Sequence, residues 1–223
     1  MTHLDIWFLD VGHGDCAYLE LPNGAKMMID CGGADNWPSR LLKYCGRTRE
    51  KGTAKVSEAQ NKGPYGLDKL VISHLHGDHL SDIAAIHGDI GFHYLTGNYG
   101  PIIDDIKIEE MDFRKRGQDA ARKFVEIVKS YSGGYDASSD YVAAARPICT
   151  VNTRRFINYS SGVDLNDISY FVSMKIGGHK ILFPGNITAT GVRATLASPD
   201  AQRFKDFVSG TTVLKVPHHG REN

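Results

Sequence analysis

The stretch LVISHLHGDH, residues 70–79, decides the fold of this chain of 223 residues. Its apolar run LVI predicts a strand, over Lys69 to Ser73, that is covered on both faces. The segment HLHGDH then places four potential metal ligands within six residues. Imidazoles and a carboxylate suit Zn²⁺, Mn²⁺ or Fe²⁺, and the turn after a strand lets them converge on a pair of ions. The sequence therefore predicts a metal site at the end of a strand.

Two other segments also end an expected strand in side chains that can bind a metal. They are FPGN, residues 183–186, and VPHHG, residues 216–220. Because strand ends on one edge of a sheet build one site, we expect both segments to lie beside HLHGDH. On its own, the pair His218-His219 is more typical of a surface or packing feature. After HLHGDH, the pair is the expected second half of the metal site.

The periodicity of apolar residues predicts an α/β protein in which sheets pack together with helices outside, because strands followed by helices occur in both halves of the chain. A Pro22-Asn23-Gly24 turn belongs to a β-meander, and a Gly177-Gly178 turn links a later hairpin. The expected strands cover Leu4 to Leu9, Asp15 to Leu21, Lys26 to Asp30, Ile168 to Ile176, Lys180 to Phe183 and Thr212 to Val216, the last with a buried pattern, VLKV. The expected helices cover Pro38 to Tyr44, Ser81 to Ile86 and Gln118 to Tyr131.

Composition and charge exclude several classes of protein. Hydrophobic residues make up 41% and charged residues 23%, which disfavours a disordered, collagen-like or coiled-coil chain. Lys+Arg and Asp+Glu both number 26, so no global field attracts nucleic acid or an anionic membrane. The N-terminus has no signal-peptide pattern, and no apolar run approaches the ~20 residues of a membrane helix. We therefore expect no membrane contact and a cytoplasmic protein whose four cysteines, which form no CxxC pair, are buried thiols.

Four segments carry a resemblance to a known family. In chain order they are FLDVGHGDCAYLELPNGAKMMIDCGG (8–33), LVISHLHGDHLSDI (70–83), NDISYFVSMKIGGHKILFPGNI (166–187) and LKVPHHG (214–220). Their order and spacing resemble the motifs of metallo-β-lactamase-fold hydrolases, and above all the hydrolase domain of the bacterial DNA-uptake competence protein. The resemblance implies an αββα sandwich, two mixed sheets with helices on the outer faces, and a metal site at one edge between the sheets. It also implies hydrolysis by a metal-held hydroxide.

The resemblance extends over nearly the whole chain and implies one metallo-β-lactamase-like domain over residues 1–223. Family members that are similar to this chain generally continue beyond VPHHG with at least one more strand and helix. We therefore expect a domain that is shortened at its C-terminus.

Carried over residue by residue, the resemblance supplies ligands for two divalent ions, Zn²⁺ or Mn²⁺. It assigns His74 and His76 to one ion, and Asp78, His79 and a histidine of VPHHG to the other. Of the two histidines in VPHHG, we favour His219 as the ligand. A further ligand position is residue 186, where the family normally has an aspartate that bridges both ions. Here it is Asn186, and a neutral amide supplies at best one oxygen donor to one ion. A weaker site, or a site for one ion only, is therefore expected.

The resemblance also implies roles beyond metal binding. Asp78, besides being a ligand, is an expected catalytic residue, together with Asp30 and His218. Asp30, in IDCGG, matches the family's first-motif aspartate, and we expect its carboxylate to hold a ligand imidazole in its tautomer and orientation. Three residues are expected to face the substrate: His218, Asp15 and His13, which stands where the competence-type pattern usually has Gln.

One family ligand has no clear match in this chain. It is the lone histidine that normally lies between the HLHGDH motif and the bridging aspartate. The segment NDIS, residues 166–169, occupies that region and resembles the NDxS segment of the competence-type branch. Whether Asn166 or Asp167 contacts a metal stays open at this point.

The competence-type resemblance implies a metal-dependent hydrolase, a phosphodiesterase or nuclease whose substrate would be single-stranded DNA or RNA. The chain has no GxSxG, no P-loop and no GxGxxG after a strand, so other enzyme classes lack support. Local basic clusters would follow a phosphate backbone if they face the metal edge. These clusters are Arg40, Lys43, Arg47, Arg49, Lys51, Lys55, Lys62, Arg114-Lys115-Arg116 and Arg154-Arg155.

Two other functions stay open. The same fold cleaves lactones, esters and thioesters, so a small-molecule hydrolase is the first alternative. The second is a catalytically impaired protein that binds nucleic acid or a partner, because Asn186 replaces the bridging aspartate. Metal content separates the binding protein from an enzyme, since two bound ions per chain favour catalysis and the absence of bound ions favours binding.

Overall fold

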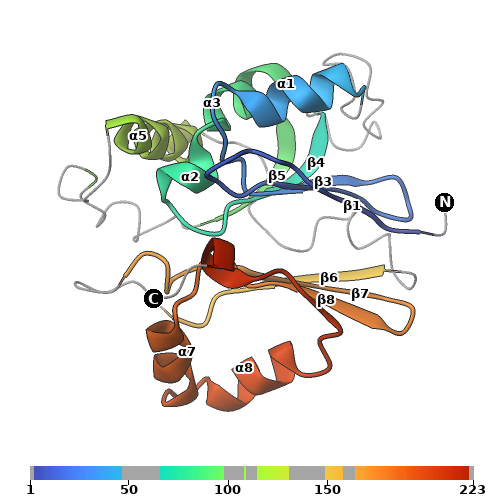
Figure 1. Ribbon diagram of the computed structural model, residues 1–223, viewed down its shortest axis with the longest axis vertical. Helices are drawn as coiled ribbons and strands as arrows, with labels where there is room; N and C mark the ends of the chain where they lie inside the picture. Colours follow the sequence, from blue (N-terminus) through green and yellow to red (C-terminus); the bar gives the residue numbers. More distant parts are fainter. Residues whose placement is uncertain are drawn as a thin grey trace.

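Two β-sheets lie face to face, with helices on their outer faces, in the computed structural model of the chain (Figure 1). The structure describes residues 3–46, 66–97, 108, 115–130, 149–157 and 164–220. One outer layer holds α1 (Trp37–Tyr44), α2 (Gly77–Leu80), α3 (Ile83–Ala85) and α5 (Lys115–Ser130), and the other holds α7 (Ala189–Leu196) and α8 (Ala201–Val208). The α/β sandwich predicted from the sequence is thereby confirmed.

The first sheet has five strands in the order β1-β2-β3-β4-β5. They are β1 (Asp5–Phe8), β2 (Ala17–Glu20), β3 (Lys26–Ile29), β4 (Leu67–Val71) and β5 (Phe92–Thr96). The first three pair antiparallel, which confirms the predicted meander, and β3, β4 and β5 pair parallel. Strand β5 was not predicted.

Side chains of the first sheet alternate between two cores. In β2, Leu19 packs between the sheets, whereas Tyr18 packs beneath the helices. In β4, Val71 faces the second sheet, and Leu70 faces the helices. Both faces of β4 are therefore covered, as the apolar run LVI predicts, although the strand begins and ends two residues earlier than expected.

The second sheet has four strands in the order β6-β7-β8-β9. They are β6 (Cys149–Arg154), β7 (Phe171–Ile176), β8 (His179–Phe183) and β9 (Val213–Leu214). The β7-β8 hairpin confirms the expected turn at Gly177, whose φ is +54°. The buried pattern expected for VLKV is wrong, because β9 lies at the sheet edge and Val213, Leu214 and Val216 are 47%, 54% and 57% exposed.

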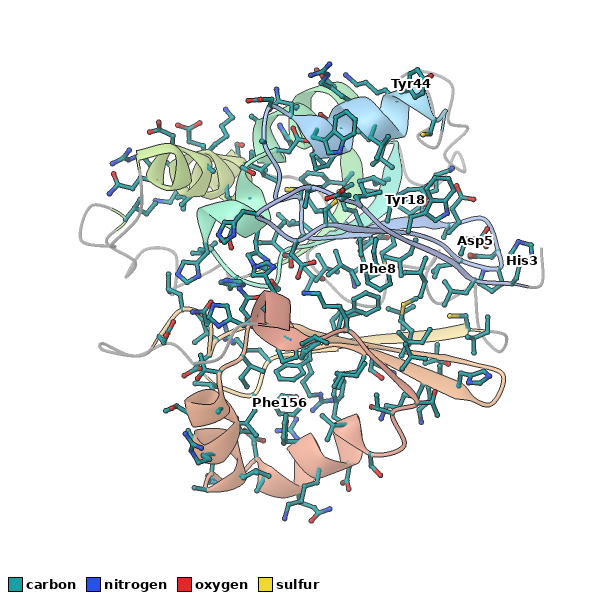
Figure 2. All side chains as sticks on the ribbon, viewed as in Figure 1. His3, Asp5, Phe8, Tyr18, Tyr44 and Phe156 are labelled. Atoms are coloured by element: carbon teal, nitrogen blue, oxygen red, sulfur yellow. The ribbon has the colours of Figure 1, made fainter. Side chains whose placement is uncertain are left out.

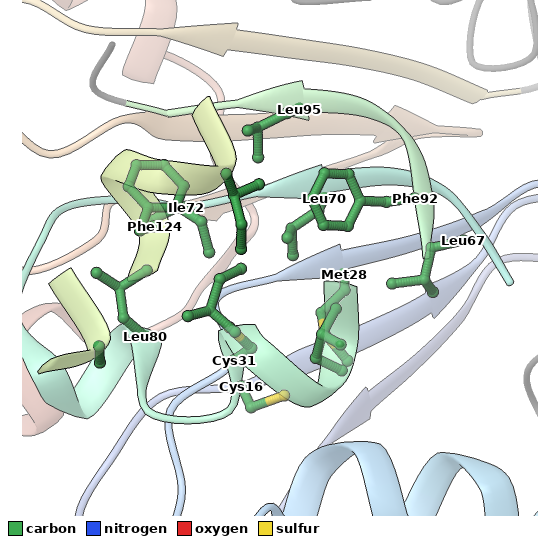
Figure 3. Packing of buried hydrophobic residues seen from close by; sticks show 14 of the residues in the cluster. Cys16, Met28, Cys31, Leu67, Leu70, Ile72, Leu80, Phe92, Leu95 and Phe124 are labelled. Atoms are coloured by element: carbon green, nitrogen blue, oxygen red, sulfur yellow. The ribbon is translucent and has the colours of Figure 1, made fainter. Parts of the chain in front are cut away.

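The outer face of the first sheet carries the larger core. Figure 3 shows Leu70 and Ile72 among Phe92, Leu95 and Phe124, the last from helix α5. On the outer face of the second sheet, Phe156 joins a smaller aromatic cluster beneath α7 and α8 (Figure 2). The two helical layers are thus fixed to the sheets by separate apolar clusters.

The helix expected over Ser81 to Ile86 is divided in the structure. Helix α2 ends at Leu80, α3 follows, and a π-helical turn, η2 (Ile86–Ile90), completes the segment. The break occurs because the backbone N–H of Asp82 donates to the carbonyl oxygen of Cys31 rather than to its own helix. Helix α5 matches its prediction more closely and lies close to α2, where a Cβ on Gly77 would stand 2.5 Å from the Cα of Gly117.

The cysteines follow the prediction with one exception. Cys16, Cys31 and Cys149 are buried free thiols, whereas Cys45 is exposed just after α1. Among the described helices, none combines the length and the apolar character needed to cross a membrane.

Candidate metal centre

The segment HLHGDH lies after the end of β4 and meets the C-terminal turn η4 (Pro217–Gly220) at one edge between the two sheets (Figure 1). Two glycines make the close packing beneath this segment possible. A Cβ on Gly32 would lie 1.5 Å from the carbonyl oxygen of Asp78, and one on Gly14 would lie 2.9 Å from it. The backbone N–H of Asp15 donates to the same carbonyl oxygen at 3.0 Å. The Gly-rich bend after β1 therefore supports the predicted metal segment directly.

Asp30 is a buried carboxylate that organises the centre from below. It follows β3 with a φ of +58°, the left-handed region that Asp tolerates better than most residues. Its Oδ1 accepts from the backbone N–H of Ser73 at 2.7 Å, and its Oδ2 accepts from the hydroxyl of Ser73 at 2.8 Å. The same Oδ2 lies 2.8 Å from Nδ1 of His79.

These contacts set the tautomers of two histidines. Because a carboxylate only accepts, Nδ1 of His79 carries the proton, and Nε2 is left with its lone pair for another partner. The hydroxyl of Ser73 donates to Asp30, so it accepts from Nδ1 of His74, 3.0 Å away. Nε2 of His74 then also carries a lone pair that can bind a cation. This is the geometry expected of Asp30 as a support for ligand imidazoles.

The first ligand group consists of Asp78, His79 and His219. Nε2 of His219 lies 3.2 Å from Oδ2 of Asp78, and Nε2 of His79 lies 3.9 Å from the same oxygen. These three side chains can hold one metal ion. Nε2 of His79 is buried and has no hydrogen-bond partner among the described residues, and the same is true of Oδ1 of Asn186. Buried polar atoms are rarely left in this state, so the residues present fit a bound cation.

Charge in this group favours an anionic Asp78. Burial alone would raise the pKa of Asp78, but the hydrogen bond with His219 and the nearby imidazoles of His79 and His76 hold it well below its usual range. Burial would lower the pKa of His79, yet the carboxylate of Asp30 outweighs it and raises that pKa. Asp78 is therefore an ionised oxygen donor near neutral pH.

The second group consists of His74, His76 and Asn166. Nε2 of His74 lies 3.0 Å from Nδ1 of His76, and Oδ1 of Asn166 lies 3.0 Å from the same nitrogen. Burial lowers the pKa of both histidines, and the imidazole of His79 contributes in each case. Both imidazoles are therefore neutral near pH 7, the form that binds metal.

The NDIS segment resolves into three separate roles. Asn166 points to His76, whereas Oδ1 of Asp167 accepts from the backbone N–H and the hydroxyl of Thr188 at 3.0 and 2.7 Å, where α7 begins. The hydroxyl of Ser169 accepts from the backbone N–H of Asn186 at 3.1 Å. Of the two residues left open by the sequence, Asn166 is the one that reaches the metal centre.

Asp15 is turned inward rather than toward a substrate mouth. Its Oδ2 forms an ion pair with Nζ of Lys215, and the two side chains are 14% and 15% exposed. Asp15, Asp30 and His79 also stand close enough to hold a metal. In that group, however, Lys215 already neutralises Asp15, and Asp30 already takes Nδ1 of His79. The placement of Asp15 therefore differs from the expected substrate-facing role, because its carboxylate holds the segment before η4.

The other two expected substrate-facing residues lie at the rim of the centre. His13 is 61% exposed, with Nε2 3.9 Å from Oδ2 of Asp78 and its ring 5.8 Å from that of His219. His218 is half-buried, and its Nδ1 is buried without a partner in the described part of the chain. Both His218 and His219 have positive φ, and their ring centroids lie 6.3 Å apart with 57° between the ring planes.

Sequence reasoning overlooked two residues of the centre. Ser73 contacts Asp30, His74 and His79, although the sequence pattern predicts only that it ends a strand. Lys215 lies in the LKVPHHG segment but pairs with a residue 200 positions away. The only available signal was that each directly precedes or lies within a ligand segment.

Comparisons with known proteins agree with this fold. Residues 9–97 match the family model of the metallo-β-lactamase superfamily. No curated protein matches the chain at a significant level. A metallo-β-lactamase-like protein of Thermotoga maritima is 13% identical, with 97% of this chain and 96% of that chain covered and a TM-score of 0.51.

Two further solved structures are similar at lower TM-scores. A metallo-β-lactamase of Cronobacter sakazakii with a HARLDQ motif is 10% identical, with 93% and 72% of the two chains covered and a TM-score of 0.49. YhfI of Bacillus subtilis, a metallo-β-lactamase fold protein, is 14% identical, with 86% and 66% covered and a TM-score of 0.42. None of these comparisons distinguishes the competence-type branch, which stays a prediction. The chain has the metallo-β-lactamase fold, and its residues 9–97 match that superfamily.

Proposed function

We propose that the chain is a metal-dependent hydrolase that cleaves phosphodiesters in single-stranded DNA or RNA. One observation carries the proposal of a metal: Nε2 of His79 is buried and unpartnered in the described structure while it faces Asp78 and His219. Asp30 fixes the opposite nitrogen, so this lone pair is held ready for a cation.

The donor set fits Zn²⁺ or Mn²⁺, because it combines imidazole nitrogens with carboxylate and amide oxygens. Asp78, His79 and His219 would hold one ion, and His74 and His76 would hold the other. The chemistry supplied by such ions is the acidification of a bound water and the stabilisation of charge on substrate oxygens. The protein's own contribution is orientation: Asp30 and Ser73 hold the imidazoles, and Lys215 holds the segment that carries His219.

The phosphodiester part of the proposal is supported by the resemblance of DVGHGD and LKVPHHG to the competence-type pattern. Exposed His13 stands beside Asp78, where it would contact a substrate. The basic residues from Arg47 to Lys62 and Arg114 lie outside the described residues. Of the others, Arg40 is exposed on α1, Lys43 pairs with Asp89, and Arg155 stacks over Tyr170.

Asn186 favours a second candidate, a protein that binds nucleic acid or a partner without cleaving it. Its Oδ1 is buried and unpartnered in the described structure, at the position where the resemblance has a bridging carboxylate. A neutral amide does not offset the repulsion between two dications held about 3.5–4 Å apart. Metal content and turnover measured together separate this candidate from the hydrolase.

The test is a hydrolysis screen with added Zn²⁺ or Mn²⁺ on single-stranded DNA, RNA, a chromogenic phosphodiester and a lactone. We expect cleavage of the phosphodiesters, with bound metal measured on the same samples by elemental analysis. Cleavage of the lactone alone would favour the small-molecule hydrolase. Absence of cleavage, with or without bound metal, would favour the impaired binder, and absence of bound metal would also overturn the metal centre.

Two variants connect activity to the centre. His76→Ala and Asp78→Ala each remove a ligand atom, so we expect each to lower bound metal and abolish hydrolysis. The matched control is His179→Ala, the same change at an exposed histidine of the β7-β8 hairpin. If both site variants kept the metal content and turnover of the His179→Ala control, the assigned site would be wrong.

A further inference from the structure

Two polar atoms contact Nδ1 of His76 in the HLHGDH segment, one from the same segment and one from a distant loop. Nδ1 of His76 has two neighbours at 3.0 Å, Nε2 of His74 and Oδ1 of Asn166. Asn166 comes from the loop before β7, ninety positions away from His76 in the sequence. The second sheet thus supplies a polar atom to a histidine pair that follows the first sheet.

Hydrogen bonding alone does not satisfy these three atoms well. His74 donates through Nδ1 to Ser73, so its Nε2 carries a lone pair toward His76. Oδ1 of Asn166 is also an acceptor. If Nδ1 of His76 carries the proton, two acceptors must share one N–H. If the other ring nitrogen carries the proton, Nδ1 of His76 is itself an acceptor, and all three atoms are acceptors. A cation that accepts lone pairs from these atoms would remove this conflict.

The two distances from Nδ1 of His76 are compatible with a shared ion. Donor atoms about 2.1 Å from a tetrahedral ion are separated by about 3.4 Å. The separations of 3.0 Å from Nδ1 of His76 to Nε2 of His74 and to Oδ1 of Asn166 need only a small expansion to reach this value.

The loop before β7 is built to hold Asn166 in place. The backbone N–H of Asn166 donates to Oδ1 of Asp164 at 2.9 Å, and the backbone N–H of Asp167 donates to the carbonyl oxygen of Asp164 at 3.0 Å. The side chain of Asp167 is fixed by Thr188 on the opposite side. A Cβ on Gly191 would lie 2.3 Å from Oδ1 of Asp167, so glycine is needed there. The turn is thus anchored on both sides of Asn166.

We propose that Asn166 is the third protein ligand of the ion held by His74 and His76. This inference rests on the proposed metal centre and adds a donor to it. The resulting donor set is two imidazole nitrogens and one amide oxygen, without an anionic ligand, whereas the neighbouring group contains the carboxylate of Asp78. The ion at His74 and His76 is therefore the weaker of the two. An amide oxygen also shifts the metal preference of this site from Zn²⁺ toward Mn²⁺, relative to a site with three imidazoles.

The test counts ions rather than turnover. The purified chain and its Asn166→Ala variant are dialysed against Zn²⁺, and separately against Mn²⁺, and bound metal per chain is measured over a range of free metal. We expect Asn166→Ala to lose one ion, or to bind its weaker ion at least about tenfold less tightly, since even an outer partner of a ligand has that effect. The affinity for the ion held by Asp78, His79 and His219 should be unchanged.

Other variants make the assignment specific. Asn166→His should restore binding and raise the ratio of Zn²⁺ affinity to Mn²⁺ affinity. The double variant His76→Ala/Asn166→Ala should lose no more metal than His76→Ala alone, whereas adding His219→Ala should remove the other ion. The matched control is Asn152→Ala, the same change at an exposed asparagine of β6. Circular dichroism of each variant confirms that the fold is retained, and Asn166→His carries the test if Asn166→Ala does not fold.

The outcomes separate this inference from the proposed function. If the unaltered chain binds no ion, the metal centre itself is wrong. If it binds metal, and neither Asn166→Ala nor Asn166→His changes any dissociation constant relative to Asn152→Ala, then Asn166 is not a ligand and only hydrogen-bonds to His76.

Discussion

Ser73→Ala is the sharpest probe of how the fold prepares the metal centre. The hydroxyl of Ser73 is buried, donates to Oδ2 of Asp30 at 2.8 Å and lies 3.0 Å from Nδ1 of His74. A hydrogen bond to a charged group contributes about 1.5–3 kcal/mol, and a buried donor left unsatisfied costs about 1–3 kcal/mol. We therefore expect Ser73→Ala to lower the free energy of unfolding of the metal-free protein by about 3 kcal/mol.

The same substitution should weaken metal binding. Without the hydroxyl, nothing fixes the tautomer of His74, and Asp30 keeps only its contacts with the backbone of residue 73 and with His79. Loss of such an outer partner lowers metal affinity by about 10- to 100-fold. Urea unfolding and metal titration measure the two effects. The control is Ser173→Ala, at an equally buried serine in β7 of the other sheet, and losses no larger than those of this control would refute the reasoning.

Three further variants test other parts of the structure. Lys215→Met leaves the Asp15 carboxylate without its cation, so it should lower the free energy of unfolding by about 2 kcal/mol and weaken binding of the ion at His219. Adding Asp15→Asn should recover part of both losses. Equal losses in the single and double variants would count against the ion pair. Asp82 is buried, which raises its pKa from 3.8 to about 6. Because the pKa of Asp82 is higher in the folded state than in the unfolded state, its contribution to the free energy of unfolding is complete below about pH 4. That contribution is lost, by about 3 kcal/mol, as the pH rises through 6. Asp82→Asn should flatten this part of the stability profile measured by urea unfolding. Asn186→Asp should destabilise the metal-free protein, since it buries a carboxylate. The same variant should raise metal affinity by at least about tenfold and raise the initial rate on whichever substrate is cleaved. A metal titration that shows no gain in affinity would exclude residue 186 as a ligand.

The position of HLHGDH was predictable because its signals are local. An apolar run followed by closely spaced ligands indicates a buried strand and a turn, and β4 and the segment after it have that form. The β-meander and the β7-β8 hairpin were predictable for the same reason, since Gly24 and Gly177 mark tight turns with positive φ.

Elements that depend on distant partners were missed. Helix α7 has the sequence ATGVRATL, whose Thr and Gly residues are poor helix formers, and it is held at its start by Thr188 and Asp167. Strand β9 reads as buried, but its position at the sheet edge exposes it. Two contacts join segments that are far apart in the chain, namely Ser73 with Asp30 and Lys215 with Asp15. No local sequence pattern predicts such contacts.

The most direct test of the central claim is an anomalous difference map from crystals grown with Zn²⁺ or Mn²⁺, recorded at the absorption edge of the metal. We expect a peak bounded by Asp78, His79 and His219, and a weaker peak beside His74 and His76. A well-ordered crystal grown with the metal that shows no anomalous peak at either position would exclude the proposed metal centre.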